Sequence, residues 1–566
     1  TISSAGLYTP GSRVGAHSIV ATSIADSSQF GTASVGVTGL AGIYTYHNDL
    51  SRDGVNSQEY ALTPTDVNTS NFGKLFSCAV DGAIYGQPLW VANLNINGTR
   101  HNVAFVATQH DSLYAFDADA SPCAQLWAAS LIDAGHGAAA GETTVPSGPT
   151  GNLVGVGDGD ISPEVGVTGT PVIDPASLTL YVVSKSVDST GTTFTQRLHA
   201  IDLTTGNERT GSPVTIAGTY PKINGTVTFS AKQQNQRTGL ALVNGTVYMG
   251  WGSHEDSNPW SGWMMGYSYN GSTFTQTAVF DSTPNKGEGG IWMSGGAPAV
   301  DSNNNLYVLT GNGAFDANSA TAPNNDYGDS LLQLTSSLAV AQYFTPSDQL
   351  TLFQGDGDFA SGGAAILADL PAGSPVPHLI MGGGKDQSLY VLNRDQLGGL
   401  GDANAVQKIS FGNSIFTTGA YWNSTYYLVG VAGPLRAYQL NASVPMFTLA
   451  GSSTNKYGFP GSAPSVSAAG TAGGVIWTMD NHSYCTKQSQ ACGPAVLHAH
   501  DAANVANELW NSSMVSTDVA GNAVKFAVPT IANGKVYIGT RGKNIGGVFG
   551  STTVSGELDV YGLKPN

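Results

Sequence analysis

The stretch Val528-Pro529-Thr530-Ile531-Ala532-Asn533-Gly534-Lys535-Val536-Tyr537-Ile538-Gly539 holds the pattern that decides the fold. A short apolar run is followed by an Asn-Gly turn and then by a second strand-forming run. Because Asn and Gly readily adopt positive φ, the stretch predicts two antiparallel strands joined by a tight hairpin. Related stretches divide most of the chain into eight units, which begin near Gly86, Gly169, Thr238, Gly296, Gly362, Gly419, Gly461 and Ala527.

A repeat of about 40–50 residues with several short strands per unit is typical of a β-propeller. Each unit alone would leave its sheet edges and an apolar face exposed, so we expect the units to close into a ring. The strand 73–80 precedes the first unit, whereas the last unit ends at Gly562 without an outer strand. We therefore predict an all-β, eight-bladed propeller of four-stranded blades over residues 73–566, closed by this N-terminal strand.

Composition excludes several classes of partner. The chain has 566 residues, a net charge of −17 and only 11% charged residues. An acidic surface disfavours nucleic acid and anionic membranes as partners. No run of 18 apolar residues occurs, so we expect no membrane-spanning helix. The first residue is Thr1, and we interpret the sequence as that of a processed, mature chain.

Four cysteines are present. Cys485 and Cys492 are close enough in sequence to form a local disulfide, and Cys78 and Cys123 would then pair by elimination. Two disulfides predict an oxidising compartment, and we expect a secreted, extracellular or cell-surface protein of a bacterium. Free buried thiols are the alternative interpretation.

Residues 1–40 differ from the repeats. They predict short strands at 6–10, 17–22 and 32–38, and the stretch resembles the final three strands of a bacterial Ig-like domain. Three strands cannot bury two sheet faces, so this partial Ig-like segment needs a partner, either its own propeller or another chain. Residues 41–72 are interpreted as a linker that carries a polar cluster around His47 and Arg52.

The third strand of several units carries a second mark. It reads Leu198-His199-Ala200-Ile201-Asp202-Leu203-Thr204-Thr205-Gly206 in one unit and Leu497-His498-Ala499-His500-Asp501 in another, and two such strands continue to Trp127 and Trp510. This pattern resembles the blade motif of pyrroloquinoline quinone (PQQ) propellers. The resemblance implies an eight-bladed quinoprotein-type fold in which the tryptophans pack between blades.

Three further segments resemble PQQ-dependent alcohol dehydrogenases. The Trp of Gly289-Gly290-Ile291-Trp292 would form the floor under the quinone, and the Asn of Thr310-Gly311-Asn312-Gly313 would bind calcium. Asp358 or Asp356, which follow Thr345-Pro346-Ser347-Asp348, would be the catalytic base. Lys385 would bind the quinone oxygens. Two features of that family are missing, since the chain has no adjacent Cys-Cys pair and only Asp188 and Gly191 where a glutamate ligand is expected.

These observations leave the function open, including whether the protein is an enzyme. The first hypothesis is a quinoprotein-like propeller that works as a binding or assembly module. It would associate with copies of itself, as an oligomer or an extracellular fibre, through residues 1–40. The second hypothesis is a PQQ- and calcium-dependent alcohol or sugar dehydrogenase. The third is a carbohydrate-active propeller that uses the tryptophan-rich loop 251–263.

Overall fold

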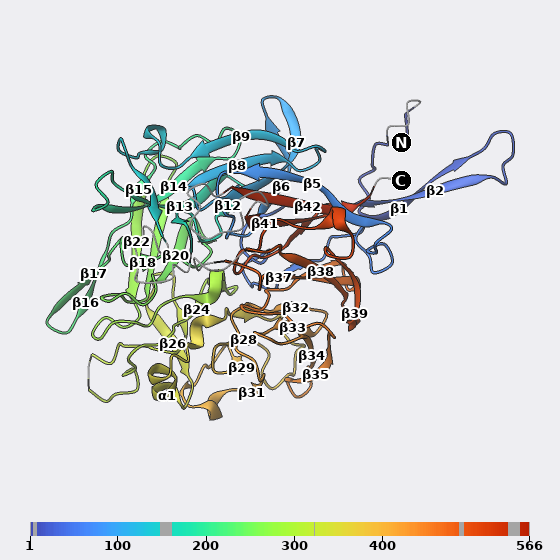
Figure 1. Ribbon diagram of the computed structural model, residues 1–566. Helices are drawn as coiled ribbons and strands as arrows, with labels where there is room; N and C mark the ends of the chain where they lie inside the picture. The colour runs from blue at the N-terminus through green and yellow to red at the C-terminus, as the bar shows by residue number, and fades with distance from the viewer. Residues whose placement is uncertain are drawn as a thin grey trace.

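The computed structural model describes residues 2–3, 8–147, 161–321, 323–485, 492–541 and 555–564. Eight antiparallel sheets follow one another around a ring, which confirms the predicted propeller (Figure 1). Blades 1 to 4 are β6 (Leu89–Ile96), β7 (Thr99–Ala107), β8 (Ser112–Asp117), β9 (Ala124–Ser130); β12 (Val172–Asp174), β13 (Thr179–Val187), β14 (Phe194–Asp202), β15 (Val214–Thr215); β19 (Ala241–Val243), β20 (Thr246–Ser253), β21 (Trp263–Tyr269), β22 (Phe274–Asp281); and β23 (Ala299–Val300), β24 (Leu306–Leu309), β25 (Leu331–Leu334), β26 (Val340–Thr345).

Blades 5 to 8 are β27 (Ala365–Ile366), β28 (Leu379–Gly383), β29 (Ser388–Asn393), β31 (Gln407–Ser410); β32 (Ala420–Trp422), β33 (Thr425–Val429), β34 (Leu435–Asn441), β35 (Met446–Ser452); β36 (Ser465–Ala469), β37 (Ala472–Asp480), β38 (Val496–Asp501), β39 (Asn504–Asn511); and β40 (Thr530–Ala532), β41 (Lys535–Arg541), β42 (Gly556–Leu563), β5 (Phe72–Val80). The first strand of each blade lies innermost. Apolar clusters fill the spaces between neighbouring blades, and Trp127 of blade 1 donates its indole N–H to Leu203 O of blade 2 at 3.0 Å.

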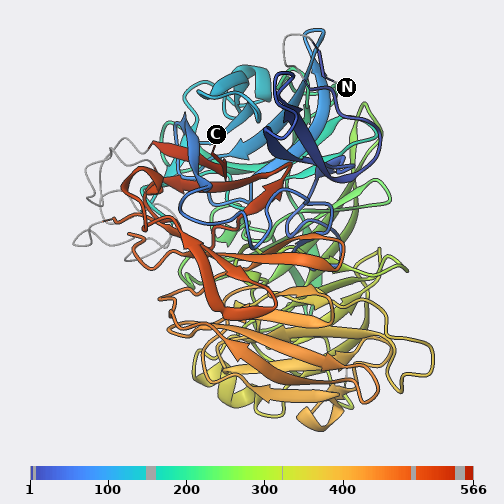
Figure 2. The ribbon, with the colours of Figure 1, turned by 90° about the vertical axis from the view of Figure 1, so that its right-hand side faces the viewer.

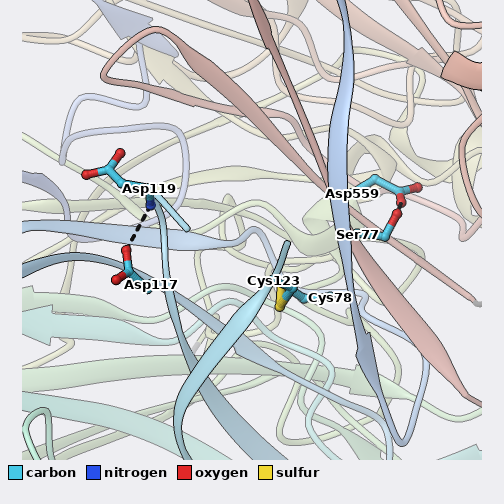
Figure 3. The surroundings of a disulfide bond; sticks show 6 residues. All are labelled: Ser77, Cys78, Asp117, Asp119, Cys123 and Asp559. Atoms are coloured by element: carbon cyan, nitrogen blue, oxygen red, sulfur yellow. Dashed lines mark hydrogen bonds between the residues drawn. A yellow bond between two sulfur atoms is a disulfide. The ribbon is translucent and has the colours of Figure 1, made fainter. Parts of the chain in front are cut away.

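The N-terminal strand closes the ring, as the sequence predicts. β5 pairs antiparallel with β42 along its length, from Val80 opposite Gly556 to Phe72 opposite Leu563. Figure 2 shows this meeting of the first and last parts of the chain. The predicted disulfide Cys78–Cys123 is present and joins β5 to the residue just before β9 of blade 1 (Figure 3). This disulfide links the first and last blades covalently. The second predicted disulfide, Cys485–Cys492, is present as well.

Residues 41–56 run around the inside of the ring and contact every blade. Backbone carbonyls of this segment accept the N–H of six innermost strands at 2.7–2.9 Å, in chain order from Ala41 with Ala92, Tyr44 with Ile173, Leu50 with Val300, Ser51 with Ile366, Asp53 with Tyr421, and Gly54 with Val466. The two remaining blades receive side-chain hydrogen bonds, from Thr45 to Leu240 O and from Asn56 to Ile531 O. Two short strands, β3 (Gly42–Ile43) and β4 (Val55–Asn56), belong to the same segment.

Arg52 holds this inner segment in place. Its guanidinium is fully buried and donates to Pro298 O, Thr45 Oγ1, Tyr46 O and Asp49 O at 2.8–3.0 Å. The ring of His47 lies beside it, with Nδ1 3.0 Å from Arg52 O and Nε2 2.8 Å from Pro464 O. Since buried charges are costly unless hydrogen-bonded, these contacts explain why a polar cluster lies at the centre of the fold.

The N-terminal residues form a hairpin that projects from the propeller (Figure 1). β1 (Gly15–Thr22) pairs with β2 (Phe30–Val37), with Gly15 opposite Val37. The third strand predicted here, 6–10, falls partly outside the described residues. An Ig-like domain is not confirmed, because a two-stranded sheet is all that the described part of residues 1–40 contains.

The remaining elements lie between or beside the blades: β10 (Thr143–Pro146), β11 (Glu164–Val165), β16 (Thr219–Lys222), β17 (Gly225–Thr228), β18 (Gln234–Asn235), β30 (Gly399–Leu400), α1 (Gln349–Gln354) and five 3₁₀ turns at Ala134–His136, Met293–Gly295, Phe359–Ser361, Asp402–Asn404 and Ser516–Asp518. Among the described residues, no helix has the length and apolar character needed to cross a membrane.

Candidate functional site

The residues predicted from the sequence converge on one side of the ring. Trp292 precedes the inner strand of blade 4, Asn312 follows β24, and Lys385 lies in the turn between β28 and β29. Asp356 and Asp358 follow α1 on the way into blade 5. Loops that leave neighbouring blades on the same face therefore bring together residues that are up to 93 positions apart, from Trp292 to Lys385.

Lys385 connects the two aspartates. Its Nζ lies 2.7 Å from Asp356 Oδ1 and 2.7 Å from Asp358 Oδ2. Asn312 supports the same pair, because its backbone N–H donates to Asp358 Oδ1 at 2.7 Å and its Nδ2 donates to Asp356 Oδ1 at 2.8 Å. Asp358 is nearly buried, whereas Asp356 lies at the surface. The four residues thus form one connected polar cluster.

Trp292 presents an aromatic surface to this cluster. Its ring packs edge-on against Trp260, with centroids 5.7 Å apart. Three glycines, Gly252, Gly290 and Gly311, lie against the ring, and a Cβ placed on Gly252 would come within 2.5 Å of Trp292 Cε3. The absence of a side chain at Gly252 therefore allows Trp292 to occupy its position.

A pocket opens above these residues, with a volume of about 730 Å³ including its open mouth. It is lined by Trp292, Asp358 and Lys385 together with residues that the sequence analysis did not single out as pocket residues, among them Asp256, Arg237, Lys525, Phe416, Phe459 and Phe526. Arg237 and Phe526 come from blades 3 and 8, and the guanidinium carbon lies 4.5 Å from the ring centroid. Blades 3 and 8 are not neighbours in the ring, so the pocket lies toward the ring axis, and it is called the axial pocket below.

Tyr46 places the inner segment close to this pocket. Its hydroxyl lies beside Thr418 and near enough to Arg237 for the arginine charge to act on it. Burial raises the pKa of Tyr46 to about 12, against the lowering effect of these neighbours. The hydroxyl is therefore neutral at physiological pH.

Positive and negative groups are both concentrated here. Burial acts to lower the pKa of Lys385, but the charges of Asp358 and Asp356 outweigh it and raise the pKa, so the ammonium is retained. Partial removal from water raises the pKa of Asp256, and the negative charge of Asp358 adds to the effect. Three cationic side chains, Arg237, Lys385 and Lys525, line one pocket of a chain whose net charge is −17.

The pocket residues fit a planar organic anion such as PQQ. Such a ligand needs an aromatic surface to stack on and cations to neutralise its carboxylates, and Trp292 with the three cations supplies both. The ring of Phe526, already in contact with Arg237, adds a second aromatic wall.

A calcium ion fits this arrangement poorly. Asn312 Oδ1 is buried and has no hydrogen-bond partner among the described residues, which suits a cation ligand. However, the ammonium of Lys385 lies between the two carboxylates, and both oxygens of Asp358 already accept N–H bonds. A calcium ion bound by Asp356 and Asp358 would have to displace Lys385.

Comparisons with known proteins support the fold. No family model matches the chain, and no curated protein matches its sequence. Among solved structures, the quinohemoprotein alcohol dehydrogenase of Comamonas testosteroni is similar over 93% of this chain and 81% of its own, with a TM-score of 0.55 and 12% identity. A europium-containing methanol dehydrogenase is similar over 92% of this chain and 98% of its own, with a TM-score of 0.53 and 13% identity.

The chain has the eight-bladed propeller fold of the quinoprotein dehydrogenases. At 12–13% identity the likeness shows the fold alone. The roles predicted for Trp292, Asn312, Asp356, Asp358 and Lys385 remain predictions, although the structure brings these residues together.

The tryptophan-rich loop does not supply the exposed platform that carbohydrate binding needs. Trp251 and Trp263 are fully buried, and Trp260 is 6% exposed. Trp251 donates its indole N–H to Gln196 Oε1 at 2.8 Å and packs edge-on against Phe229. These tryptophans are part of the core between blades.

Proposed function

We propose that the protein is a binding propeller whose axial pocket takes a planar, conjugated polycarboxylate, with PQQ as the model ligand. The observation that carries the proposal is the set of three cations that line the same pocket as Trp292 in a strongly acidic chain. Lys385 and Arg237 would bind carboxylate or quinone oxygens, and Trp292 would stack on the ring system. The fit of the pocket residues to a planar anion supports this proposal.

A second candidate is a dehydrogenase that uses the same pocket. Asp358 favours it, because this nearly buried carboxylate lies beside Lys385 and lines the pocket near Trp292. Asp358 would take the hydroxyl proton of an alcohol, and a bound quinone would supply the acceptor for the hydride that leaves the alcohol carbon. Against this candidate, Asp358 Oδ2 is paired with Lys385 and Asp358 Oδ1 accepts the Asn312 N–H, so the base is not available in this arrangement.

One experiment separates the two candidates. PQQ is titrated into the full chain with calcium and again with a chelator, and dye reduction is then followed with alcohols and with sugars. The binding proposal predicts saturable binding in both conditions and no substrate-dependent dye reduction. Calcium-dependent binding with turnover that Asp358→Asn abolishes would establish the dehydrogenase instead. The absence of any binding would contradict both candidates.

The two disulfides support a location outside the reducing cytoplasm. A secreted or cell-surface protein is therefore part of the proposal, and its test is the retention of both disulfides in protein isolated from its source.

Assembly through the N-terminal hairpin is a separate part of the proposal. Val20, Ile24 and Phe30 lie on or next to β1 and β2, and their side chains are 54%, 105% and 66% exposed. An isolated two-stranded sheet is at most marginally stable in water, so this hairpin gains from a partner. A second copy of the chain that pairs with it would yield an oligomer or a fibre.

A further inference from the structure

A cluster of metal-binding side chains lies in blade 7, away from the axial pocket. It consists of His498, His500 and Glu508, whose candidate ligand atoms all lie within 4.8 Å of one another. His500 is fully buried and His498 is 9% exposed. Within the described part of the chain, no other group of three His, Cys, Asp or Glu residues meets this condition.

Strand geometry explains the cluster. His498 and His500 are two residues apart on β38, so both side chains point to the same face of the sheet. Glu508 lies opposite His500 on β39, and irregularities in the β38–β39 register between Ala499 and Asp501 bring it beside both rings. From the sequence we expected no zinc site, because the His-x-His spacing of His498-Ala499-His500 was overlooked; this spacing is the signal that could have found the cluster.

The hydrogen bond of His500 to a backbone carbonyl decides which of its ring nitrogens can bind a metal. His500 Nδ1 is 3.0 Å from Val505 O, and since a carbonyl only accepts, this nitrogen carries the proton. The lone pair is therefore on Nε2, which lies 3.1 Å from the Tyr457 hydroxyl. Histidines that bind metals are commonly oriented by such a bond from the other ring nitrogen to a carbonyl.

His498 and its neighbours provide the other candidate ligand atoms for a metal. His498 Nδ1 lies 2.5 Å from Glu508 Oε1 and also 3.3 Å from Asn455 Nδ2. One ring nitrogen cannot donate to the carboxylate and accept from the amide at once, so the contacts conflict. The other amide atom, Asn455 Oδ1, is buried without a hydrogen-bond partner in the described residues. Rotation of the Asn455 amide would turn this oxygen toward the cluster. A metal ion bound by His498 Nδ1 and Glu508 Oε1, in place of the proton between them, would remove the conflict.

Blade 2 contains a matched position that lacks one ligand. There His199 Nδ1 lies 2.8 Å from Glu208 Oε2, and Ile201 pairs with Glu208 as His500 pairs with Glu508. The His–Glu pair is thus a structural feature that two blades share, whereas the second histidine is particular to blade 7. In blade 2 the other nitrogen of His199 is bonded to Ser184 Oγ at 2.8 Å, and Ile201, which stands where blade 7 has His500, supplies no second imidazole.

We propose that His498, His500 and Glu508, with Asn455 as a fourth ligand, bind a first-row transition-metal ion such as Zn²⁺. Two imidazole nitrogens with a carboxylate and an amide oxygen form a donor set that suits such ions better than calcium or magnesium. The ion would tie β38 and β39 to the loop that carries Asn455 and Tyr457, which enters from blade 6.

The test is calorimetric titration of ZnSO₄ into the chelator-treated full chain, with metal content measured after dialysis. We expect one zinc ion per chain. His500→Ile, which copies blade 2, should weaken binding by about tenfold or more, and so should Glu508→Gln. His378→Asn is the control: His378 is partly exposed and already faces Asp395 at 2.8 Å, so binding should be unchanged.

Melting curves show whether each variant is folded. If His500→Ile does not fold, the binding measured for Glu508→Gln decides whether the proposal holds. Absence of zinc binding by the natural chain would overturn the proposal. So would binding that His500→Ile and Glu508→Gln leave unchanged, or binding that the control abolishes.

Discussion

The disulfide between Cys78 and Cys123 joins the last blade to the first. Cys78 belongs to β5, which completes blade 8, and Cys123 lies directly before β9 of blade 1. Lys535 of blade 8 reinforces the same seam, because its Nζ lies 2.7 Å from Asp119 of blade 1. The seam of the ring is therefore fastened by strand pairing, by a covalent bond and by an ion pair.

The two disulfides should differ in their contribution to stability. Cys78–Cys123 closes 45 residues and Cys485–Cys492 closes 7, so chain entropy predicts losses of about 4 and about 2.4 kcal/mol when each is removed. We expect Cys78→Ser/Cys123→Ser to melt at the lower temperature of the two double mutants. Equal melting curves would contradict the importance of the seam.

The inner segment should be essential because of Arg52. Arg52→Met leaves the buried carbonyls of Pro298, Tyr46 and Asp49 without their donor, and we expect a loss of about 3 kcal/mol or more. Arg100→Met is the matched control, because Arg100 is exposed and makes one hydrogen bond, to Asn93 O. Chemical denaturation of both variants measures the difference, and similar losses would show that residues 41–56 do not hold the blades.

The carboxyl group of Asp53 should make the stability of the protein depend on pH. Burial, together with the negative charge of Asp49, raises the pKa of Asp53 to about 8. The folded chain therefore keeps this proton at pH values where the unfolded chain has released it. The contribution of Asp53 to the free energy of unfolding is largest below about pH 4 and is lost as the pH rises to about 8.

Asp53→Asn should remove this dependence. The variant retains an acceptor for the Val55 N–H, so we expect it to be more stable than the natural chain by about 1–3 kcal/mol at pH 8, and little different at pH 4.5. Asp348→Asn, at an exposed position, is the control. Urea titrations at both pH values provide the measurement. Equal effects of Asp53→Asn at the two pH values would contradict the assignment.

The N-terminal hairpin should govern self-association. We expect light scattering to detect concentration-dependent oligomers of the intact chain and a monomer when residues 1–37 are deleted. The variant Val20→Ser/Phe30→Ser should show an intermediate effect, because it keeps the strands and removes exposed apolar area. An intact chain that remains monomeric at high concentration would refute assembly through this segment.

Much of the fold could be predicted because each blade repeats its own local signals. Gly169, Gly296 and Ala527, taken from the sequence as starts of units, each lie three residues before an inner strand, at Val172, Ala299 and Thr530. The closing strand was predictable because the last blade lacks an outer strand. By contrast, residues 41–56 contact the blades mainly through backbone carbonyls, which any residue type supplies, so no sequence pattern reveals their course.

The candidate site was predictable only in part, for a similar reason. Trp292, Asn312 and Lys385 lie in short motifs with recognisable spacing. Arg237 and Lys525 lie in loops with no motif and reach the pocket from blades that are distant in sequence, so only the closed ring shows that they meet. The pairing of Lys385 with both aspartates also depends on side-chain geometry that the sequence does not specify.

The most direct test of the binding proposal is a PQQ titration of the chelator-treated full chain and four variants, followed by absorbance and tryptophan fluorescence. Trp292→Ala and Lys385→Met should each weaken binding by about tenfold or more, since each removes a stacking or charge-assisted contact. Trp422→Ala and Lys408→Met lie outside the pocket and should bind as the natural chain does. No saturable binding, or binding that Trp292→Ala and Lys385→Met leave intact, would contradict the account.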